Sequence, residues 1–300
     1  MRRAVAAVIE AQALRGAQST RFVAVLWTLC AVLLCAALGA CASDRGEAEL
    51  ADAPTEPVSQ IESSDGPLLL SAPPAASTID DDVLDSAARG VVAVRARGCG
   101  PVANGTAFAV APGLLVGAAH VVAGAPSVEI EWSTSESTEP SRHLVDVVGY
   151  EEDSDLALFR TESGVPPLSI DQAQLGTNGA VLGFERSSEF VVSPARIEHY
   201  VSASGLWGQE TTRSVYVLAV DIRKGQSGGP LIDQDGSVVG VVFAAIQGPQ
   251  DIGFALSREE LVRFLISAGI DARVNDRGET VIAAQPASLE EVPHGECRIG

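Results

Sequence analysis

The stretch "KGQSGGPLID", residues 224–233, surrounds one serine, Ser227, with three glycines and a proline. A serine hydroxyl is a weak nucleophile, and it becomes reactive only beside a base, a group that orients the base, and donors for the developing oxyanion. This turn can supply the donors, because glycine permits backbone angles that would aim the N–H groups of Gly225 and Ser227 at one point. The alternative is an ordinary glycine-rich hairpin.

The candidate base is His120, in "VGAAHVVAG" (116–124). The two alanines before it would let a short helical turn bring the imidazole to a cleft, where it could accept a proton. The alternative is a partly buried structural histidine. The other histidines are expected to be structural or solvated, namely His143, His199 and His294.

The candidate orienting group is Asp155, in "DSDLALF" (153–159), where it enters an apolar strand. Burial of a carboxylate is costly unless the carboxylate is hydrogen-bonded, and an imidazole N–H would provide such a bond. Asp153 and Asp146 are the alternatives. The three local patterns together predict a Ser-His-Asp triad, which is recognised by geometry rather than by chain order.

Short runs rich in Val, Ile and Leu, separated by Gly, Pro, Asn and Asp, fill most of residues 79–300 and predict an all-β barrel or sandwich. Helices are expected at 79–89 and 257–269. The second would begin with a capping box of Ser257 and Glu260 and end at Gly269, with an irregular tail over 270–300. The expected strands are 91–97, 105–110, 113–117, 127–132, 144–150, 155–160, 179–184, 190–200, 213–221, 229–233, 237–246 and 252–256.

Six strings carry a family resemblance: "GTAFAV", "GAAHVVAG", "DLALF", "GQSGGPLID", "GSVVGVVF" and "DIGFAL". With them the chain resembles the chymotrypsin-fold serine peptidases, particularly the bacterial HtrA-type branch, and within it the actinobacterial periplasmic proteases linked to acid resistance. The resemblance implies two antiparallel six-stranded β-barrels with a C-terminal helix. It also implies a serine endopeptidase that acts on proteins or peptides and needs no metal or cofactor.

The same resemblance assigns the roles of the site residues. His120 would be the general base and then the acid, Asp155 would orient it, and Ser227 would attack the peptide carbonyl. The N–H groups of Gly225 and Ser227 would hold the oxyanion. Two other possibilities are a protease-fold binding module that does not turn over substrate and a chaperone-like protein of the cell envelope.

A substrate pocket is also implied by the resemblance. An acid six residues before the nucleophile, here Asp221, lies at the bottom of the pocket in the trypsin branch and would favour a basic P1 residue; alternatively, Asp221 is bonded within the barrel. Small residues in the cleft would instead favour a small or medium apolar P1 residue. The other positions expected to line the cleft are Phe243, Ala244, Ala245, Gly253 and Phe254.

Two positions depart from the family pattern. Gly117 replaces the usual Ser or Thr before the alanine-histidine step, and is expected to loosen the packing of the histidine turn. Gln226 stands where animal-type enzymes carry the aspartate that captures a freshly cut N-terminus, so activation by that salt bridge is not expected.

The composition restricts the partners. The chain carries 39 acidic and 20 basic residues, a formal net charge of −19, which repels the phosphate backbone of nucleic acids. It contains no CxxC or HExxH pattern, and its four histidines are scattered, so that no protein-built zinc site is expected.

Residues 1–42 are predicted to be a signal or membrane-anchor segment, because the uncharged run Phe22–Ala42 is long enough to span a bilayer. Arginines before it and acids after it place the rest of the chain outside the cytoplasm, in the periplasm or cell envelope. "LGAC" (38–41) resembles a bacterial lipobox, which would lipidate Cys41; an uncleaved anchor and a freely secreted product are the alternatives. Residues 43–78, rich in Pro, Ser, Ala and acids, are predicted to be a disordered linker to a protease domain over 79–300.

Of the five cysteines, only Cys99 and Cys297 lie beyond the N-terminal apolar run and its end. In an oxidising compartment these two could form a disulfide that closes nearly the whole domain, and the alternative is two free thiols. The family resemblance supports the bridge, because the acid-resistance proteases also carry one cysteine just before the first barrel and another near the C-terminus.

Overall fold

The computed structural model describes residues 70–98, 101–132, 141–186, 189–203, 212–247, 251–283 and 286–295. Its helices are α2 (Asp81–Ala88), α3 (Ala119–Val122), α4 (Arg258–Ser267) and the 3-10 turn η2 (Pro286–Ser288). Its strands are β1 (Val91–Arg97), β2 (Ala103–Ala111), β3 (Leu114–Ala118), β4 (Ser127–Trp132), β5 (Ser141–Glu151), β6 (Leu156–Arg160), β7 (Asn178–Phe184), β8 (Phe190–Ala203), β9 (Arg213–Ala219), β10 (Pro230–Ile232), β11 (Val238–Ile246), β12 (Ile252–Ser257), β13 (Asp271–Val274) and β14 (Thr280–Ala283).

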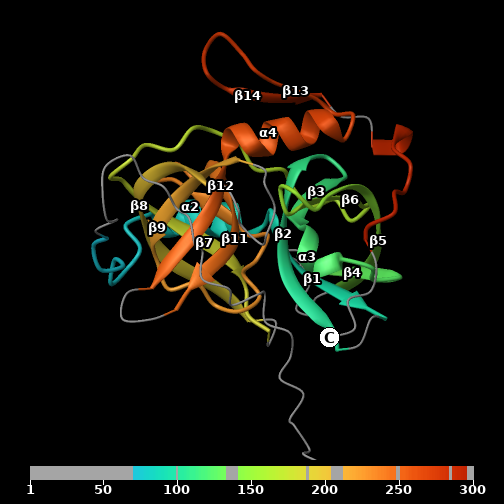
Figure 1. The fold of residues 1–300 in the computed structure, drawn as a ribbon, viewed down its shortest axis with the longest axis horizontal. Helices are drawn as coiled ribbons and strands as arrows, with labels where there is room; N and C mark the ends of the chain where they lie inside the picture. Colours follow the sequence, from blue (N-terminus) through green and yellow to red (C-terminus); the bar gives the residue numbers. More distant parts are fainter. Residues whose placement is uncertain are drawn as a thin grey trace, which may run out of the picture. The chain divides into compact units, whose positions relative to one another are not determined.

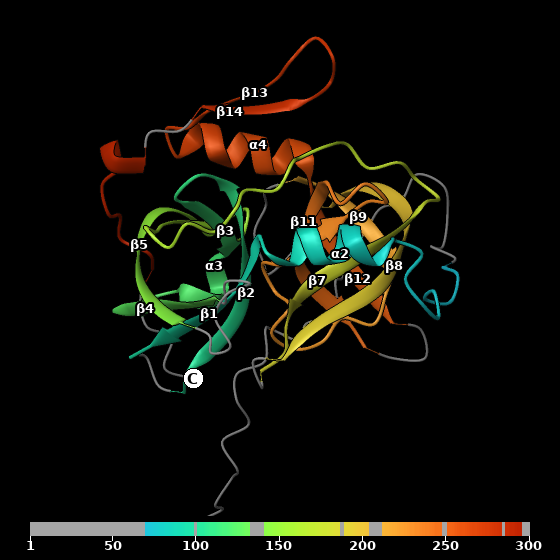
Figure 2. The ribbon, with the colours of Figure 1, turned by 180° about the vertical axis from the view of Figure 1, so that it is seen from behind.

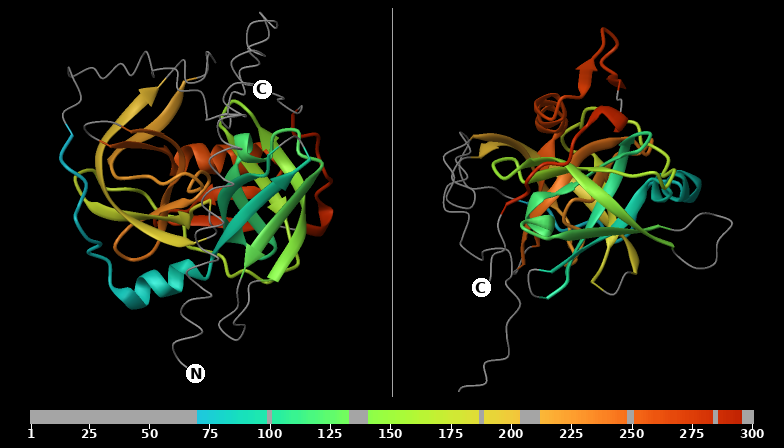
Figure 3. Two further views of the ribbon diagram at one scale, coloured as in Figure 1. Left: turned by 90° about the horizontal axis from the view of Figure 1, so that it is seen from below. Right: turned by 90° about the vertical axis from the view of Figure 1, so that its right-hand side faces the viewer.

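Twelve strands form two closed barrels, which lie side by side in Figure 1 and in the left view of Figure 3. The first closes in the order β1-β2-β3-β6-β5-β4 and the second in the order β10-β11-β12-β9-β8-β7. The strand pairs within each barrel are antiparallel. This architecture confirms the predicted fold of two six-stranded antiparallel barrels followed by a C-terminal helix.

The period of two along each strand explains why the barrels pack together. On β2, Ala107 and Ala109 belong to the core of the first barrel. Phe108 and Val110 alternate with them and belong to a larger core that includes Phe254 of the second barrel. Because β2 is apolar on both faces, it fills its own barrel and also packs against the neighbouring one.

α4 lies above both barrels in Figure 1, and its buried residues Leu261, Phe264 and Leu265 join the shared core. Ser257 caps its start by accepting from the N–H of Glu260. At its end Gly269 has a φ of 82°, and the N–H of Gly269 and Ile270 donate to Ile266 and Leu265, which is the Schellman pattern.

The expected capping box at α4 is only half formed. The carboxylate of Glu260 accepts from the backbone N–H of Ser214 at 2.7 Å and pairs with Arg263. Glu260 therefore ties α4 to the start of β9, which is a tertiary contact that the local pattern could not indicate.

The prediction of an irregular tail is wrong over residues 271–283, which form the antiparallel hairpin of β13 and β14 above α4. The side chain of Asn275 accepts from the N–H groups of Arg277 and Glu279, and Gly278 has a φ of 84°. Asn and Gly support turns in this way, so "NDRGE" (275–279) is a turn signal that the sequence analysis missed.

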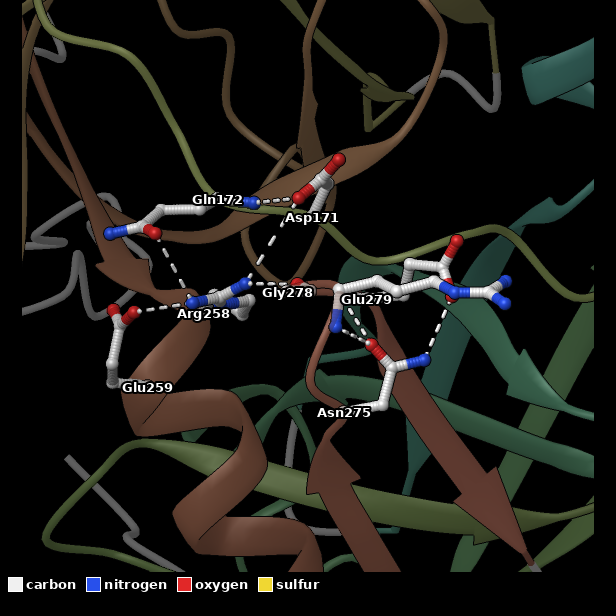
Figure 4. A network of polar contacts seen from close by, with 8 residues as sticks. Asp171, Gln172, Arg258, Glu259, Asn275, Gly278 and Glu279 are labelled. Carbon is white, nitrogen blue, oxygen red and sulfur yellow. Dashed lines mark hydrogen bonds and ion pairs between the residues drawn. The ribbon is translucent and has the colours of Figure 1, made fainter.

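Figure 4 shows that Arg258, the first residue of α4, holds this hairpin in place. Its guanidinium donates to the carbonyl of Gly278 at 3.0 Å, and it also bonds to Gln172 and Glu259. Arg258 is 7% exposed, and these contacts supply acceptors to its two Nη groups, whereas its buried Nε has no hydrogen-bond partner among the described residues.

The N-terminal part of the described chain lies on the second barrel. Figure 2 shows α2 across this barrel, and a Cβ on Gly236 would lie 2.8 Å from Cγ1 of Val83. The helix predicted at 79–89 is thus present as Asp81–Ala88. Of the predicted linker, the structure describes only residues 70–78, which form no helix or strand, although Leu70 is buried.

The predicted segment 1–42, with the apolar run and Cys41, lies outside the described residues. Within the residues that are described, no helix combines the length and apolar character needed to cross a membrane.

Candidate active site

Two hydrogen bonds join His120 to Asp155. The carboxylate Oδ2 lies 2.7 Å from Nδ1 of the imidazole, and Oδ1 accepts from the backbone N–H of His120 at 2.8 Å. A carboxylate can only accept, so Nδ1 carries the proton and Nε2 keeps its lone pair. The side chain of Asp155 is 7% exposed and that of His120 is 36% exposed. A buried carboxylate therefore supports an imidazole that is itself partly exposed.

The backbone holds the same pair together. Asp155 follows β5 at the turn into β6, with a φ of 52°, a left-handed conformation that Asp tolerates better than most residues. Its carbonyl accepts from the N–H of Ala119 at 3.0 Å. The residue before His120 is thus fixed to Asp155, and the two side chains cannot separate without distorting the barrel.

The turn with Ser227 lies against the element that carries His120. Gly228 has a φ of 83°, and a Cβ there would lie 2.3 Å from the carbonyl oxygen of Thr106 and 2.4 Å from the nitrogen of Ala118. Ala118 ends β3, two residues before His120. Only glycine permits this approach, and it brings the serine turn of the second barrel to the histidine turn of the first.

The expectation that Gly117 loosens the histidine turn is wrong. A Cβ there would lie 2.9 Å from Cε2 of Phe159 and 3.1 Å from the carbonyl oxygen of Thr106. Gly117 therefore lies in a filled space against β2 and β6 of the first barrel, where a larger residue would force its neighbours apart.

Gly225 and Ser227 offer two free backbone donors. Among the described residues, none accepts from the N–H of either residue. Gly225 has a φ of 107°, and a Cβ on it would lie 2.5 Å from the carbonyl oxygen of Phe184. The carbonyl of Lys224 is turned to the N–H of Arg186, at 3.2 Å. The carbonyl of Lys224 and the N–H of Gly225 belong to the same peptide unit and point in opposite directions. Because the carbonyl is directed to Arg186, the N–H of Gly225 points the other way and remains available for an oxyanion.

Gln226, at the position of the missing aspartate, braces the turn from within. It is fully buried. Its Oε1 accepts from the backbone N–H of Arg223 at 2.7 Å and from the hydroxyl of Ser193 at 3.2 Å. A neutral amide thus connects the turn to Arg223 and to β8 without an ion pair.

Arg213 is a buried cation near the carboxylates of the site. It is 2% exposed. Burial lowers the pKa of its guanidinium, while the negative charges of Asp155, Asp153, Glu260 and Glu151 act in the opposite direction. Arg213 thus places a positive charge close to the carboxylate that bonds to His120.

Phe243 and Phe254, two of the positions expected to line the cleft, are buried in the shared core, with ring centroids 6.3 Å apart. Gly253 pairs with Ala245, and a Cβ on Gly253 would lie 2.5 Å from Val220. Ala244 is partly buried and Ala245 is exposed. The two phenylalanine side chains therefore belong to the core, and the side chains of Ala244 and Ala245 are the ones accessible to solvent.

Asp221 forms an ion pair with Arg223, with 2.7 Å between Oδ2 and Nη2. Its side chain is 43% exposed. Its charge is thus partly compensated by a neighbour on the same loop, which weakens the argument for a basic P1 residue.

Cys99 and Cys297 lie outside the described residues. Cys99 belongs to the connection between β1 and β2, and so falls within the sequence of the first barrel rather than before it. The part of the chain that the structure describes holds no group of three or more His, Cys, Asp or Glu side chains suited to a metal ion.

Sequence reasoning missed Thr106 and Arg213. Thr106 belongs to the quoted string "GTAFAV", but it was given no role because its partners are more than seventy residues away. Arg213 begins a strand, where arginine is ordinarily solvated, and the pattern around it carries no signal of burial.

A family model described as the trypsin-like peptidase domain matches residues 105–241. The serine protease Rv3671c of Mycobacterium tuberculosis (strain ATCC 25618 / H37Rv) is 32% identical over 212 residues, which are 68% of this chain and 52% of that protein. This chain thus spans about half the length of the curated relative it matches. The crystal structure of the Rv3671c protease in its active form has a TM-score of 0.60 at 29% identity, covering 78% of this chain and 98% of that one. The inactive form has a TM-score of 0.58 at 31% identity, covering 67% and 100%.

Proposed function

Because this chain belongs to the trypsin-like serine protease family, we propose that it is a serine endopeptidase whose triad is His120, Asp155 and Ser227. The observation that carries the proposal is the pair of hydrogen bonds between His120 and Asp155, which lies beside the glycine-rich turn with Ser227. A histidine with only a structural role does not need a buried carboxylate that forms hydrogen bonds with both its imidazole ring and its backbone N–H. The free N–H groups of Gly225 and Ser227 complete the requirements for acyl transfer.

The proposed reaction follows from these positions. Ser227 Oγ attacks the peptide carbonyl while Nε2 of His120 takes its proton, and the N–H groups of Gly225 and Ser227 stabilise the resulting oxyanion. His120 then protonates the leaving amine, which breaks the peptide bond and leaves an acyl-enzyme. Water, deprotonated by His120, hydrolyses the ester and restores the serine.

The proposal predicts selective labelling of one serine. A fluorophosphonate reacts with serine hydroxyls that are activated by a base and an oxyanion site, so the folded full chain should be labelled at Ser227. Mass spectrometry of the digested adduct identifies the labelled residue. Ser227→Ala should abolish labelling, while Ser202→Ala, at an exposed position on β8, should leave it intact.

Absence of labelling in a folded, monodisperse parent protein would contradict the proposal and favour a silent protease-fold binding or chaperone-like module. Labelling that persists in Ser227→Ala would show that another serine is the nucleophile.

We also propose that the chain is exported to the periplasm or cell envelope and is tethered to the membrane. The support is the uncharged run Phe22–Ala42, with arginines before it and acids after it. Tethering would occur through an uncleaved anchor or through lipidation at Cys41. Cleavage without lipidation would instead release the domain.

A disulfide between Cys99 and Cys297 is part of this proposal. Gly98 packs on Pro126, since a Cβ on Gly98 would lie 2.4 Å from the proline ring. His294 bonds to the same loop, with 2.7 Å between its Nε2 and the carbonyl oxygen of Ala125. The described residues that lead to the two cysteines therefore lie against one short loop, Gly124–Pro126.

Mapping of unreduced, alkylated protein from the cell envelope should show a peptide in which Cys99 is linked to Cys297. A loop of about 200 residues closed in this way contributes roughly 4–5 kcal/mol in the chain-entropy model, so the Cys99→Ser and Cys297→Ser variants should melt at lower temperature. Recovery of both residues as alkylated free thiols would contradict the bridge.

A further inference from the structure

Thr106, on β2 of the first barrel, makes three hydrogen bonds to the second barrel. Its hydroxyl donates to the carbonyl of Gly225 at 2.8 Å and accepts from the N–H of Phe184 at 2.9 Å. Its backbone N–H donates to the carbonyl of Ser227 at 2.9 Å. Thr106 is 1% exposed, so water does not compete for these bonds.

The direction of the hydroxyl proton is fixed by its partners. The N–H of Phe184 can only donate, and therefore occupies a lone pair of the hydroxyl oxygen. The carbonyl of Gly225 can only accept, and therefore receives the single hydroxyl proton. Valine has the shape of threonine but can replace neither function.

These bonds determine how the serine turn is oriented. The carbonyls of Gly225 and Ser227 are both directed to Thr106, while the N–H groups of the same two residues bond to no described residue. A rotation of the whole turn, which would carry both N–H groups with it, would break a bond to Thr106 inside a buried space.

The surroundings of Thr106 leave no freedom for such a rotation. A Cβ on Gly183 would lie 2.8 Å from Oγ1 of Thr106, and one on Gly229 would lie 3.3 Å from its Cγ2. With Gly228, which approaches the carbonyl of Thr106, three glycines enclose this residue. The side chain is thus in direct contact with the backbone of the turn, and nothing intervenes that could absorb a shift.

We propose that Thr106 is a positioning residue of the oxyanion site, and that its hydroxyl holds the Gly225–Ser227 turn from the opposite barrel in the conformation that binds the oxyanion. This inference rests on the proposed peptidase function. Thr106 touches neither substrate nor reacting atoms, and acts through the carbonyls of Gly225 and Ser227.

The test compares Thr106→Val and Thr106→Ser in the full chain, with Thr161→Val as the matched control. Thr161 is also a buried threonine of the first barrel, and its hydroxyl bonds to the hydroxyl and N–H of Ser163. The measurements are kcat and KM on a peptide substrate, the affinity for a peptide boronate, whose tetrahedral adduct places an oxygen in the oxyanion site, and the melting temperature.

Thr106→Val should lower kcat about 10- to 100-fold, since small displacements of oriented groups and the loss of an oxyanion donor have effects of this order. Boronate affinity should fall in parallel while KM changes little, because the oxyanion forms only after binding. Thr106→Ser, which keeps the hydroxyl, should restore kcat and boronate affinity. Thr161→Val should match the parent in kcat and in boronate affinity.

Parental kcat and boronate affinity in Thr106→Val would overturn the proposal, as would a loss that appears only in KM. If Thr106→Val does not fold, Thr106→Cys replaces it, because a thiol is a weaker donor of similar size; it should fall below Thr106→Ser in kcat, and equality of the two would overturn the inference. Fluorophosphonate labelling of the parent distinguishes failure of the positioning role from failure of the proposed peptidase function. A labelled parent with an unaffected Thr106→Val removes only the positioning role, while an unlabelled parent removes the peptidase function.

Discussion

Replacing Ser227 with alanine is expected to lower kcat/KM by about 10⁶-fold, and His120→Ala should have an effect of the same order. Each variant removes one half of a single step, in which the hydroxyl attacks only while the imidazole takes its proton. The double variant should therefore be hardly slower than either single variant. Steady-state assays on one peptide substrate at saturating and subsaturating concentrations give all three values.

Two outcomes would contradict this expectation. Losses that multiply in the double variant would mean that Ser227 and His120 act independently. A parental rate in Ser227→Ala would remove the serine from the mechanism. The residual rate in the variants carries information as well, because the donors on Gly225 and Ser227 remain and should still accelerate hydrolysis over the uncatalysed reaction.

Much of the fold could be predicted from local patterns. β1 and β4 have the predicted bounds, and α4 begins after the predicted cap residue Ser257 and ends two residues before the predicted stop, Gly269. These elements have strong apolar runs and clear end signals. The closure of twelve strands into two barrels came instead from the family resemblance, because a period of two is the same in a barrel and in a sandwich.

The candidate site was predictable where the chemistry needs a particular residue type in a particular local setting. The contact of His120 with Asp155 is an example, because a carboxylate entering an apolar strand must find a donor. Thr106 gave no such signal. A threonine in a strand is ordinary, and its role depends on Gly225, which lies 119 residues away in the sequence.

The burial of two side chains on β11 and β12 was not predicted either. Phe243 and Phe254 were expected to line a substrate cleft, but the structure places their side chains in the core. A register shift in the pairing of β11 with β12 falls at Phe243. Because one extra residue reverses the direction of the side chains that follow, sequence alternation alone cannot identify which residues of this strand face the peptide.

Asp155→Asn tests the part of the site that is best defined by geometry, and should lower kcat about 10⁴-fold while the protein stays folded. The amide oxygen can still accept from the backbone N–H of His120, and Asn tolerates the left-handed φ of 52° at this position. The amide NH2 group, however, would face Nδ1 and donate to it. The proton then moves to Nε2, so that the imidazole can no longer accept the proton of Ser227.

The matched control is Asp153→Asn, at an exposed position two residues earlier in the same turn. It removes the same charge and also tests the alternative orienting group, and we expect activity near that of the parent. Asp155→Ala should be both inactive and less stable, because it loses the acceptor for the N–H of His120 and places alanine at a positive φ. Thermal melts separate this loss of stability from the loss of rate. Equal impairment of Asp153→Asn and Asp155→Asn would show that the effect is one of net charge, and an active Asp155→Asn would show that His120 does not depend on the carboxylate for its tautomer.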